Sequence, residues 1–264
     1  MFKKPAILLF AAAISLAFAT ERTEAASTTI DQGLLDKGVI KVDYTPSNQA
    51  KAIVRISKDN ATFDYALSQG AQYPLQLGNG SYTVLIAEAV SGSKYKVVSQ
   101  DQIDLQMADE TEVFKQSNPI IQWDETTKAV VKAKQLTKSA KTDKEKVKAV
   151  YGFVTKTFTY DEAKAKTVAP GYIPNLDKVY KASKGICYDF ASTFAAMTRS
   201  VGIPTKLVIG KEKNHPDILH AWNEVYLQDQ WVVVDTTYDA ARVQAGQTPA
   251  IFKDAANYKG TKVY

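Results

Sequence analysis

Two kinds of hydrophobic periodicity divide the chain near residue 117. Before this point, apolar and polar residues alternate in short runs, as at 40–44 and 82–86. Residues 78–80 read Gly-Asn-Gly and contain the Asn-Gly pair typical of a tight hairpin. Alternation of this kind, with turn residues between the runs, predicts short antiparallel strands. We therefore expect residues 26–116 to form a small β-sandwich.

Beyond residue 117 the apolar positions change to helical spacing, first at 124–140. Residues 142–145, Thr-Asp-Lys-Glu, form a capping-box pattern that predicts the start of a second helix. A loop with Pro and Gly is expected at 164–175, and a further helix at 187–201 is ended by Gly202 and Pro204. Strand patterns follow at 205–210, 219–227 and 231–234. Residues 117–264 are therefore predicted to be an α+β domain.

The candidate chemistry lies in this second half, which holds the chain's one cysteine and both of its histidines. Cys187 stands at a predicted helix start, where free N–H groups and the helix dipole stabilise a thiolate and an oxyanion. His220 lies in one predicted strand and Asp235 ends the next. Because a hairpin folds the second strand back along the first, we expect Asp235 to lie near His220. His215 is expected in a polar loop at 211–217.

Thiol, imidazole and carboxylate are the three groups that nucleophilic acyl transfer needs. The thiolate attacks a carbonyl carbon, the imidazole moves the proton, and the carboxylate fixes the imidazole's tautomer. Trp222 alternates onto the same strand face as His220 and is expected to wall either the site, as a candidate substrate contact, or the core. Asn223, Glu224 and Asp189 are expected to be structural, with Asp189 a first-turn carboxylate favoured by the helix dipole.

Several segments, taken in order, resemble the core of the transglutaminase-like superfamily. They are Gly-Ile-Cys-Tyr-Asp-Phe-Ala at 185–191, Gly-Ile-Pro at 202–204, His-Ala-Trp-Asn-Glu-Val at 220–225, and the strand from Trp231 to Asp235. The resemblance covers about residues 120–240. It implies a papain-like α+β core in which Cys187 is the nucleophile, His220 the base and Asp235 the orienting carboxylate.

The chain departs from the family pattern at two places. The family commonly has proline after its aspartate, whereas this chain has Thr236. The family's side-chain oxyanion donor has no clear match, so the backbone N–H of Cys187 is the candidate. The calcium-binding loops of animal transglutaminases are not evident, and we predict no metal or other cofactor.

The function that these features predict is cysteine-dependent acyl transfer from an amide or peptide bond, through a thioester, to water or an amine. Water is always present, which favours hydrolysis, with transglutaminase activity next. One alternative is a catalytically silent module that binds cell-wall polymer or a protein. A metal site built from Cys187, the two histidines and Asp235 would just reach the ligand count that such sites need, and a helix-start cysteine suits nucleophilic use better.

Residues 1–25 have the layout of a secretory signal peptide, with Lys3 and Lys4 before an apolar run at 7–19. This run is shorter than the roughly 20 residues of a transmembrane helix, although a retained N-terminal anchor is the alternative. We expect an exported protein, extracellular or associated with the cell wall, with protein or peptide substrates and no stable membrane span after cleavage.

One cysteine excludes an internal disulfide. The net charge of +5 comes with no basic-aromatic motif, so no nucleic-acid partner is predicted.

Overall fold

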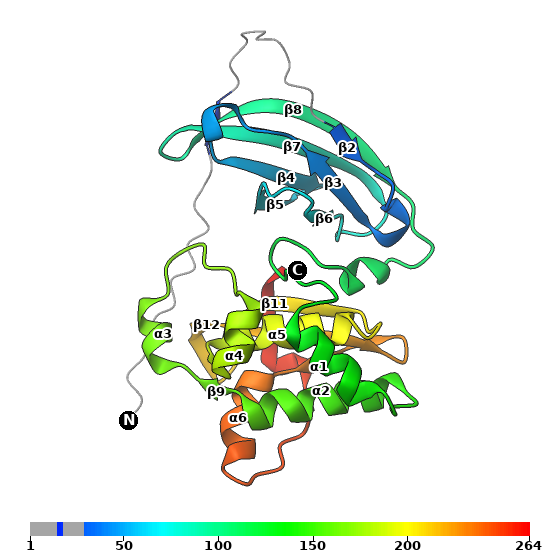
Figure 1. Cartoon of the computed structure of the whole chain (residues 1–264), viewed down its shortest axis with the longest axis vertical. Coiled ribbons are helices and arrows are strands. Elements are labelled where there is room, and N and C mark those ends of the chain that lie inside the picture. Colours follow the sequence, from blue (N-terminus) through cyan, green and yellow to red (C-terminus); the bar gives the residue numbers. More distant parts are fainter. Residues whose placement is uncertain (1–14, 18–28) are drawn as a thin grey trace. The chain divides into compact units, whose positions relative to one another are not determined.

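The computed structural model describes residues 15–17 and 29–264 (Figure 1). The chain forms two compact units, and the boundary between them falls after Pro119. The signal peptide predicted at 1–25 lies outside the described residues, except for β1 (Ser15–Ala17), which pairs in parallel with β8. Within the described part of the chain, no helix is long and apolar enough to cross a membrane.

The N-terminal unit contains two sheets, ordered β1-β8-β7-β4-β5 and β2-β3-β6. Their strands are β2 (Thr29–Asp31), β3 (Val39–Asp43), β4 (Ala52–Lys58), β5 (Ala61–Ala66), β6 (Gln72–Pro74), β7 (Gly80–Ser91) and β8 (Lys94–Leu105). Every pairing among these seven strands is antiparallel. Tyr65 on β5 meets Tyr73 on β6 edge to face, with ring centroids 6.0 Å apart. The two sheets therefore pack on each other, which confirms the predicted antiparallel β architecture.

The Asn-Gly pair does not form the predicted tight hairpin, because β6 and β7 belong to different sheets. The hydroxyl of Tyr82 organises this connection instead. It donates to the carbonyls of Leu75 and Gly78, at 2.9 and 2.6 Å, and accepts from the N–H of Leu77 at 2.8 Å. The side chain of Asn79 bonds both the N–H and the carbonyl of Met107. These longer-range bonds outweigh the local turn preference.

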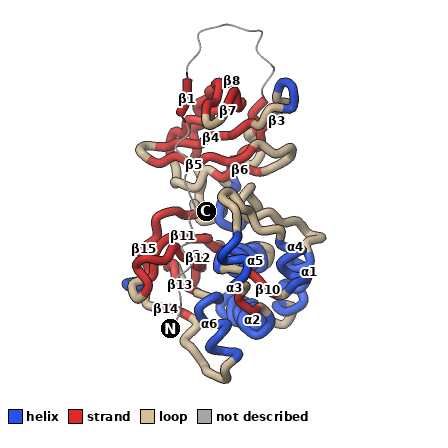
Figure 2. The backbone as a smooth tube through the Cα atoms, turned by 90° about the vertical axis from the view of Figure 1, so that its left-hand side faces the viewer, coloured by secondary structure: helices blue, strands red, loops and turns tan. Residues whose placement is uncertain are grey.

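The C-terminal unit has one five-stranded antiparallel sheet, ordered β14-β13-β12-β11-β15, together with six helices (Figure 2). The helices are α1 (Lys128–Thr137), α2 (Asp143–Thr157), α3 (Glu162–Thr167), α4 (Leu176–Ala182), α5 (Cys187–Arg199) and α6 (Thr236–Gln244). The strands of the sheet are β11 (Thr205–Glu212), β12 (His215–Leu227), β13 (Gln230–Val234), β14 (Phe252–Lys253) and β15 (Tyr258–Val263). Two short strands, β9 (Thr159–Tyr160) and β10 (Lys184–Gly185), pair in parallel beside α5. The mixed α+β class is confirmed.

Helix α5 is the centre of this unit, and every one of its residues is buried. Its apolar side chains share one core with α1, α2 and the sheet; members of that core include Phe190, Phe194, Met197, Val147, Val150, Val225 and Val234. The predicted start of α2 is also confirmed. Thr142 accepts from the N–H of Glu145 at 3.2 Å, and the Glu145 carboxylate accepts from the N–H of Lys141 at 2.6 Å. Core and caps together hold the start of α5 in a fixed place against the sheet.

Two segments that the sequence predicts as loops, 164–175 and 211–217, contain regular structure. The segment 164–175 begins inside α3, whose N-cap Asp161 accepts from the N–H of Lys164 at 3.0 Å. In the second, β11 continues to Glu212 and β12 begins at His215. The Glu212 carboxylate accepts from the backbone and side-chain amides of Asn214, at 3.0 and 2.8 Å, and so closes a tight turn. His215 is therefore a strand residue and not the predicted loop residue.

Candidate active site

Cys187 is the first residue of α5, as the sequence predicts, and it is free and buried. The chain reaches it through β10, which is held by pairing with β9. Gly185 is required here, because a Cβ at this position would lie 2.5 Å from the Cβ of Asp189. The Asp189 carboxylate accepts from the N–H of Ile186 at 2.8 Å and caps the helix. The thiol thus stands at a helix start whose backbone is fixed from both sides.

His220 and Asp235 meet as the predicted hairpin requires. In the β12–β13 pairing Val234 lies opposite Asn223, and Asp235 follows directly as the N-cap of α6. His220 Nε2 and Asp235 Oδ2 are 2.7 Å apart. The other oxygen, Oδ1, accepts from the N–H of Tyr238 at 3.0 Å. Thr236 occupies the first helical position, which favours proline without requiring it, so the departure from the family pattern leaves the carboxylate in place.

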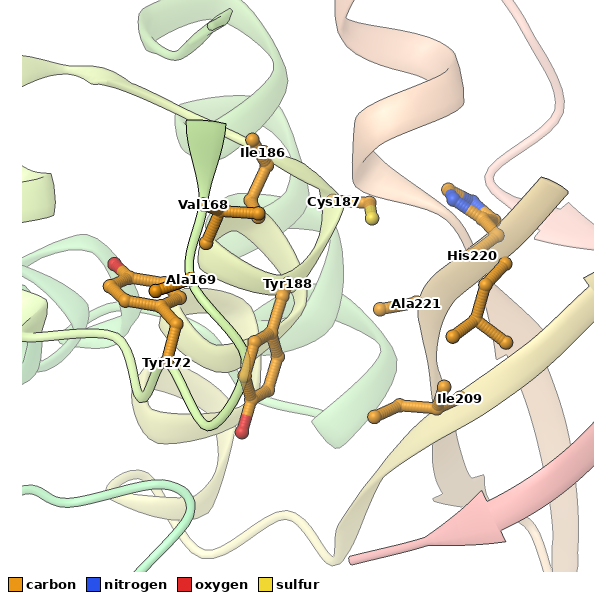
Figure 3. Close-up of a pocket in the computed structure, with 10 residues that line it drawn as sticks. Val168, Ala169, Tyr172, Ile186, Cys187, Tyr188, Ile209, His220 and Ala221 are labelled. Carbon is orange, nitrogen blue, oxygen red and sulfur yellow. The ribbon is translucent and has the colours of Figure 1, made fainter. Parts of the chain in front are cut away.

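The thiol of Cys187 faces the imidazole of His220 across the start of α5 (Figure 3). The two side chains are close enough that Cys187 contributes to raising the pKa of His220. Because Nε2 is engaged by Asp235, Nδ1 is the ring nitrogen left for the thiol. The structure therefore brings the three predicted residues together in the order Cys187, His220, Asp235.

His220 and Asp235 each stabilise the charged form of the other. Burial alone would lower the pKa of His220, but the charge and hydrogen bond of Asp235, with a smaller effect of Cys187, raise this pKa well above its usual 6.5. Burial likewise acts to raise the pKa of Asp235, yet the charge of His220 and several hydrogen bonds lower it. The pair therefore favours imidazolium beside carboxylate, which is the state that attracts a thiolate.

These opposite shifts predict a stability window for the His220–Asp235 pair. A raised histidine pKa gives stability that is complete below the unfolded value of about 6.5 and is lost as pH rises through the folded pKa. A lowered aspartate pKa gives stability that is complete above about 3.9 and is lost as pH falls through the folded pKa. We expect the stability advantage of the protein over His220→Gln to be greatest between about pH 4 and 6.5.

Denaturant unfolding at pH values from 3 to 10 measures this difference in the free energy of unfolding. The matched control is His215→Gln, which removes the exposed histidine at the start of β12. Its free energy of unfolding should differ little from that of the parent protein, because the side chain that it removes is exposed. A difference between His220→Gln and the parent protein that does not change with pH would contradict the ion pair.

Tyr258 is a site residue that the sequence did not reveal. It begins β15, in the tail that carries no recognised motif, and its hydroxyl donates to Asp235 Oδ2 at 3.2 Å. Burial, followed by the charge of Asp235, raises the pKa of Tyr258. Its approach depends on Gly210, which pairs with His220 in β11–β12. A Cβ at Gly210 would collide with the Lys259 carbonyl of β15.

Of the two places predicted for Trp222, the wall of the site and the core, the structure shows the core. Trp222 is 1% exposed and packs with Val208 and Val233, while the ring of Tyr258 covers it at a centroid distance of 5.1 Å. Alternation correctly placed Trp222 on the face of His220, but β15 closes that face. Asn223 is structural, as predicted, since its amide donates to the carbonyls of Ala191 and Lys206.

Asp189 does more than the sequence predicts of a first-turn carboxylate. It is fully buried, and besides the N–H of Ile186 it binds Lys164 Nζ at 2.7 Å and the Tyr172 hydroxyl at 2.6 Å. Lys164 Nζ also lies 2.6 Å from the Tyr172 hydroxyl. This group, the Asp189 cluster, ties α3 and the loop after it to the start of α5. No local pattern in the sequence points to Lys164 or Tyr172.

A cavity opens directly beside Cys187 and His220. Its walls come from the loop after α3 (Val168, Ala169, Tyr172), from the neighbours of Cys187 (Ile186, Tyr188), and from β11 and β12 (Ile209, Leu219, Ala221). Figure 3 shows these groups on opposite sides of the thiol, with the helix start and loop facing the strands. A second cavity also borders His220 and is lined by Glu212, His215, Ile218 and Tyr238. His220 thus stands between two cavities, and only the first borders Cys187.

Two further groups near the thiol bear on an oxyanion. The N–H of Cys187 is among the first four of α5, which have no partner within a helix. Tyr160, on β9, is close enough that its pKa, raised chiefly by burial, is raised further by charge on Cys187. Across the described residues, no three His, Cys, Asp or Glu side chains are arranged to hold a metal ion. The geometry is that of a thiol, imidazole and carboxylate beside hydrogen-bond donors.

This fold and site define an α+β domain with a Cys-His-Asp arrangement at a helix start. Residues 131–236, which lie within the C-terminal unit, match the model of the Transglutaminase-like superfamily. Members of this superfamily are usually cysteine-dependent acyl-transfer enzymes.

Curated relatives and solved structures are similar to parts of the chain. Kyphoscoliosis peptidase of Homo sapiens is 29% identical over 117 residues, which cover 41% of this chain and 18% of the human protein. The chain therefore spans about a fifth of the length of this relative and of its Mus musculus counterpart. The periplasmic domain of TgpA from Pseudomonas aeruginosa gives a TM-score of 0.39 at 15% identity, covering 85% of this chain and 98% of that one. A TGase crystal structure gives 0.34 at 26% identity, covering 42% and 30%.

Proposed function

We propose that this protein is a cysteine-dependent enzyme that transfers the acyl group of an amide or peptide bond through a thioester on Cys187. The observation that carries the proposal is the placement of Cys187, at the start of α5, beside His220, whose ring is held by Asp235. A nucleophile beside a base, with the base oriented by a third group, is the arrangement that activates a side chain for covalent catalysis.

The reaction has two halves. In the first, the Cys187 thiolate attacks the carbonyl carbon, the N–H of Cys187 stabilises the oxyanion, and protonated His220 gives its proton to the departing amine. The C–N bond breaks and a thioester remains on Cys187. In the second, His220 takes a proton from water or from an amine, which attacks the thioester and releases Cys187. Asp235 stays ionised throughout and steadies the cationic imidazole.

Of the two possible outcomes, hydrolysis is the preferred proposal and transfer to an amine is the second candidate, because water needs no dedicated binding site and an amine does. The proposed substrates are proteins or peptides outside the cytoplasm, including those of the cell wall. Export is part of the proposal and rests on the signal-peptide pattern of residues 1–25.

Alkylation by iodoacetamide tests the activated thiol directly, because Cys187 is the chain's one cysteine and therefore its one thiol. We expect the protein to react at least about ten times faster than His220→Ala at pH 6.5, since the imidazolium favours the reactive thiolate. The rate is measured by intact mass from pH 5.5 to 9.5. In 8 M urea, the control condition, both proteins should react at the same rate. Equal rates in the folded proteins would overturn the proposal and favour a silent binding module.

A further inference from the structure

The two cavities that meet at His220 differ in what they can hold during the proposed reaction. After the C–N bond breaks, the acyl group stays attached to the Cys187 sulfur, so it lies in a cavity that borders Cys187. The departing amine takes its proton from His220 and leaves past that ring. The cavity lined by Val168, Tyr172, Ile186, Tyr188, Ile209 and Leu219 borders both side chains. The cavity of Glu212, Ile218 and Tyr238 borders His220 without bordering Cys187.

The first cavity, hereafter the acyl pocket, is apolar around the thiol. Besides Cys187 and His220, its described lining consists of aliphatic side chains and two tyrosines. The polar end of Tyr172 is committed to Asp189 and Lys164, and its ring meets that of Tyr188 edge to face at 6.3 Å. Lys164 and Asp189 neutralise each other behind this wall. Apart from Cys187 and His220, whose charges face each other and Asp235, the described lining holds no charged side chain, so a charged group entering the pocket would lose water with little compensation.

We propose that the acyl pocket selects acyl donors with an apolar side chain next to the scissile carbonyl, and that the second cavity receives the departing amine side. This inference rests on the proposed function and specifies its substrate class as peptides cut at an apolar residue. An aliphatic or aromatic side chain gains free energy by leaving water for such walls. An acidic or basic side chain meets the desolvation cost and finds only the Cys187–His220 pair, whose charges are already engaged with each other and with Asp235.

Peptidyl chloromethyl ketones test the preference with one reactive group and different side chains. In each, the Cys187 thiolate displaces chloride, so that an S–C bond forms and the C–Cl bond breaks. N-acetyl leucyl, phenylalanyl, aspartyl, lysyl and glutaminyl reagents are compared by intact mass, and each rate is divided by the iodoacetamide rate of the same protein. We expect the leucyl or phenylalanyl reagent to react at least about ten times faster than the aspartyl and lysyl reagents, which is the preference that one buried apolar side chain supplies.

Variants of the wall connect the preference to this pocket. Val168→Lys and Ala169→Lys place a cation at the acyl pocket in the loop after α3, and Ala169 is exposed, so the second variant strains no core. Both should lower the leucyl-to-aspartyl rate ratio at least about five-fold. The matched control is Val90→Lys, a 68% exposed valine of the N-terminal unit, which should leave the ratio unchanged.

The possible results separate the two proposals. Equal rates for all side chains, or a faster glutaminyl or charged reagent, would overturn the apolar pocket even where Cys187 is activated. If the leucyl-to-aspartyl ratio were unchanged in both wall variants, the selecting pocket would not be the one that Val168 and Ala169 line. If the protein and His220→Ala reacted with iodoacetamide at the same rate, the proposed function alone would be overturned. The leucyl-to-aspartyl ratio would still test the pocket, because both of its rates are measured on one protein.

Discussion

Replacing Cys187 with alanine is expected to lower kcat/KM on a cleaved peptide amide by at least about 10³-fold, because no other thiol can form the thioester. His220→Ala should lose a comparable factor, and Asp235→Asn a smaller one, since the amide holds the ring without steadying its positive charge. Groups that act as one unit lose activity together. The double variant Cys187→Ala/His220→Ala should therefore be no slower than Cys187→Ala alone.

Steady-state kinetics with one peptide amide measures all of these variants. The matched control is Asp229→Asn in the turn between β12 and β13, where the backbone has a positive φ of 60° that asparagine accepts. It should keep the parent rate. Activity that survives in Cys187→Ala, or losses that multiply in the double variant, would contradict a shared nucleophile and base.

The proximity of Cys187, His220 and Asp235 was predictable because each of the segments that carry them depends on short-range pattern. The helical spacing after Cys187, with Gly202 and Pro204 behind it, fixes where α5 begins and ends. A hairpin is equally local, so strand alternation and the turn before Trp231 suffice to bring Asp235 back to His220. The sequence left the register open, and the paired positions Asn223 and Val234 now define it.

The parts that could not be predicted depend on distant segments. Tyr258 reaches Asp235 because β15 returns to pair with β11, some fifty residues earlier, and no local pattern encodes that pairing. The same strand covers Trp222 and so decides between its two predicted places, the wall of the site and the core. Lys164 lies in α3, a six-residue helix that is too short to show an apolar stripe. The Asp189 cluster could therefore not be predicted from the sequence, because its members come from separate segments of the chain.

The second large effect is expected at this cluster, where Asp189→Ala should lower the free energy of unfolding by about 3 kcal/mol. The substitution leaves the Lys164 ammonium and the N–H of Ile186 without their carboxylate, and both are at least partly buried. Removing one partner of a buried ion pair costs more than the pair itself contributes. Lys164 is 27% exposed and recovers some hydration, so the loss should stay at the lower end of that class.

Denaturant unfolding at pH 7 measures the loss, and a double-mutant cycle with Lys164→Met isolates the pair. The double variant should be more stable than the sum of the single losses predicts, because it no longer contains an unpaired charge. Asp143→Ala is the matched control, since its carboxylate pairs with Lys146 at an exposed first turn and should contribute no more than about 1 kcal/mol. If Asp189→Ala were no more harmful than this control, the cluster would not be what holds the start of α5. The iodoacetamide rate of Asp189→Ala would then equal that of the parent protein, whereas a cluster that positions Cys187 requires the rate to fall.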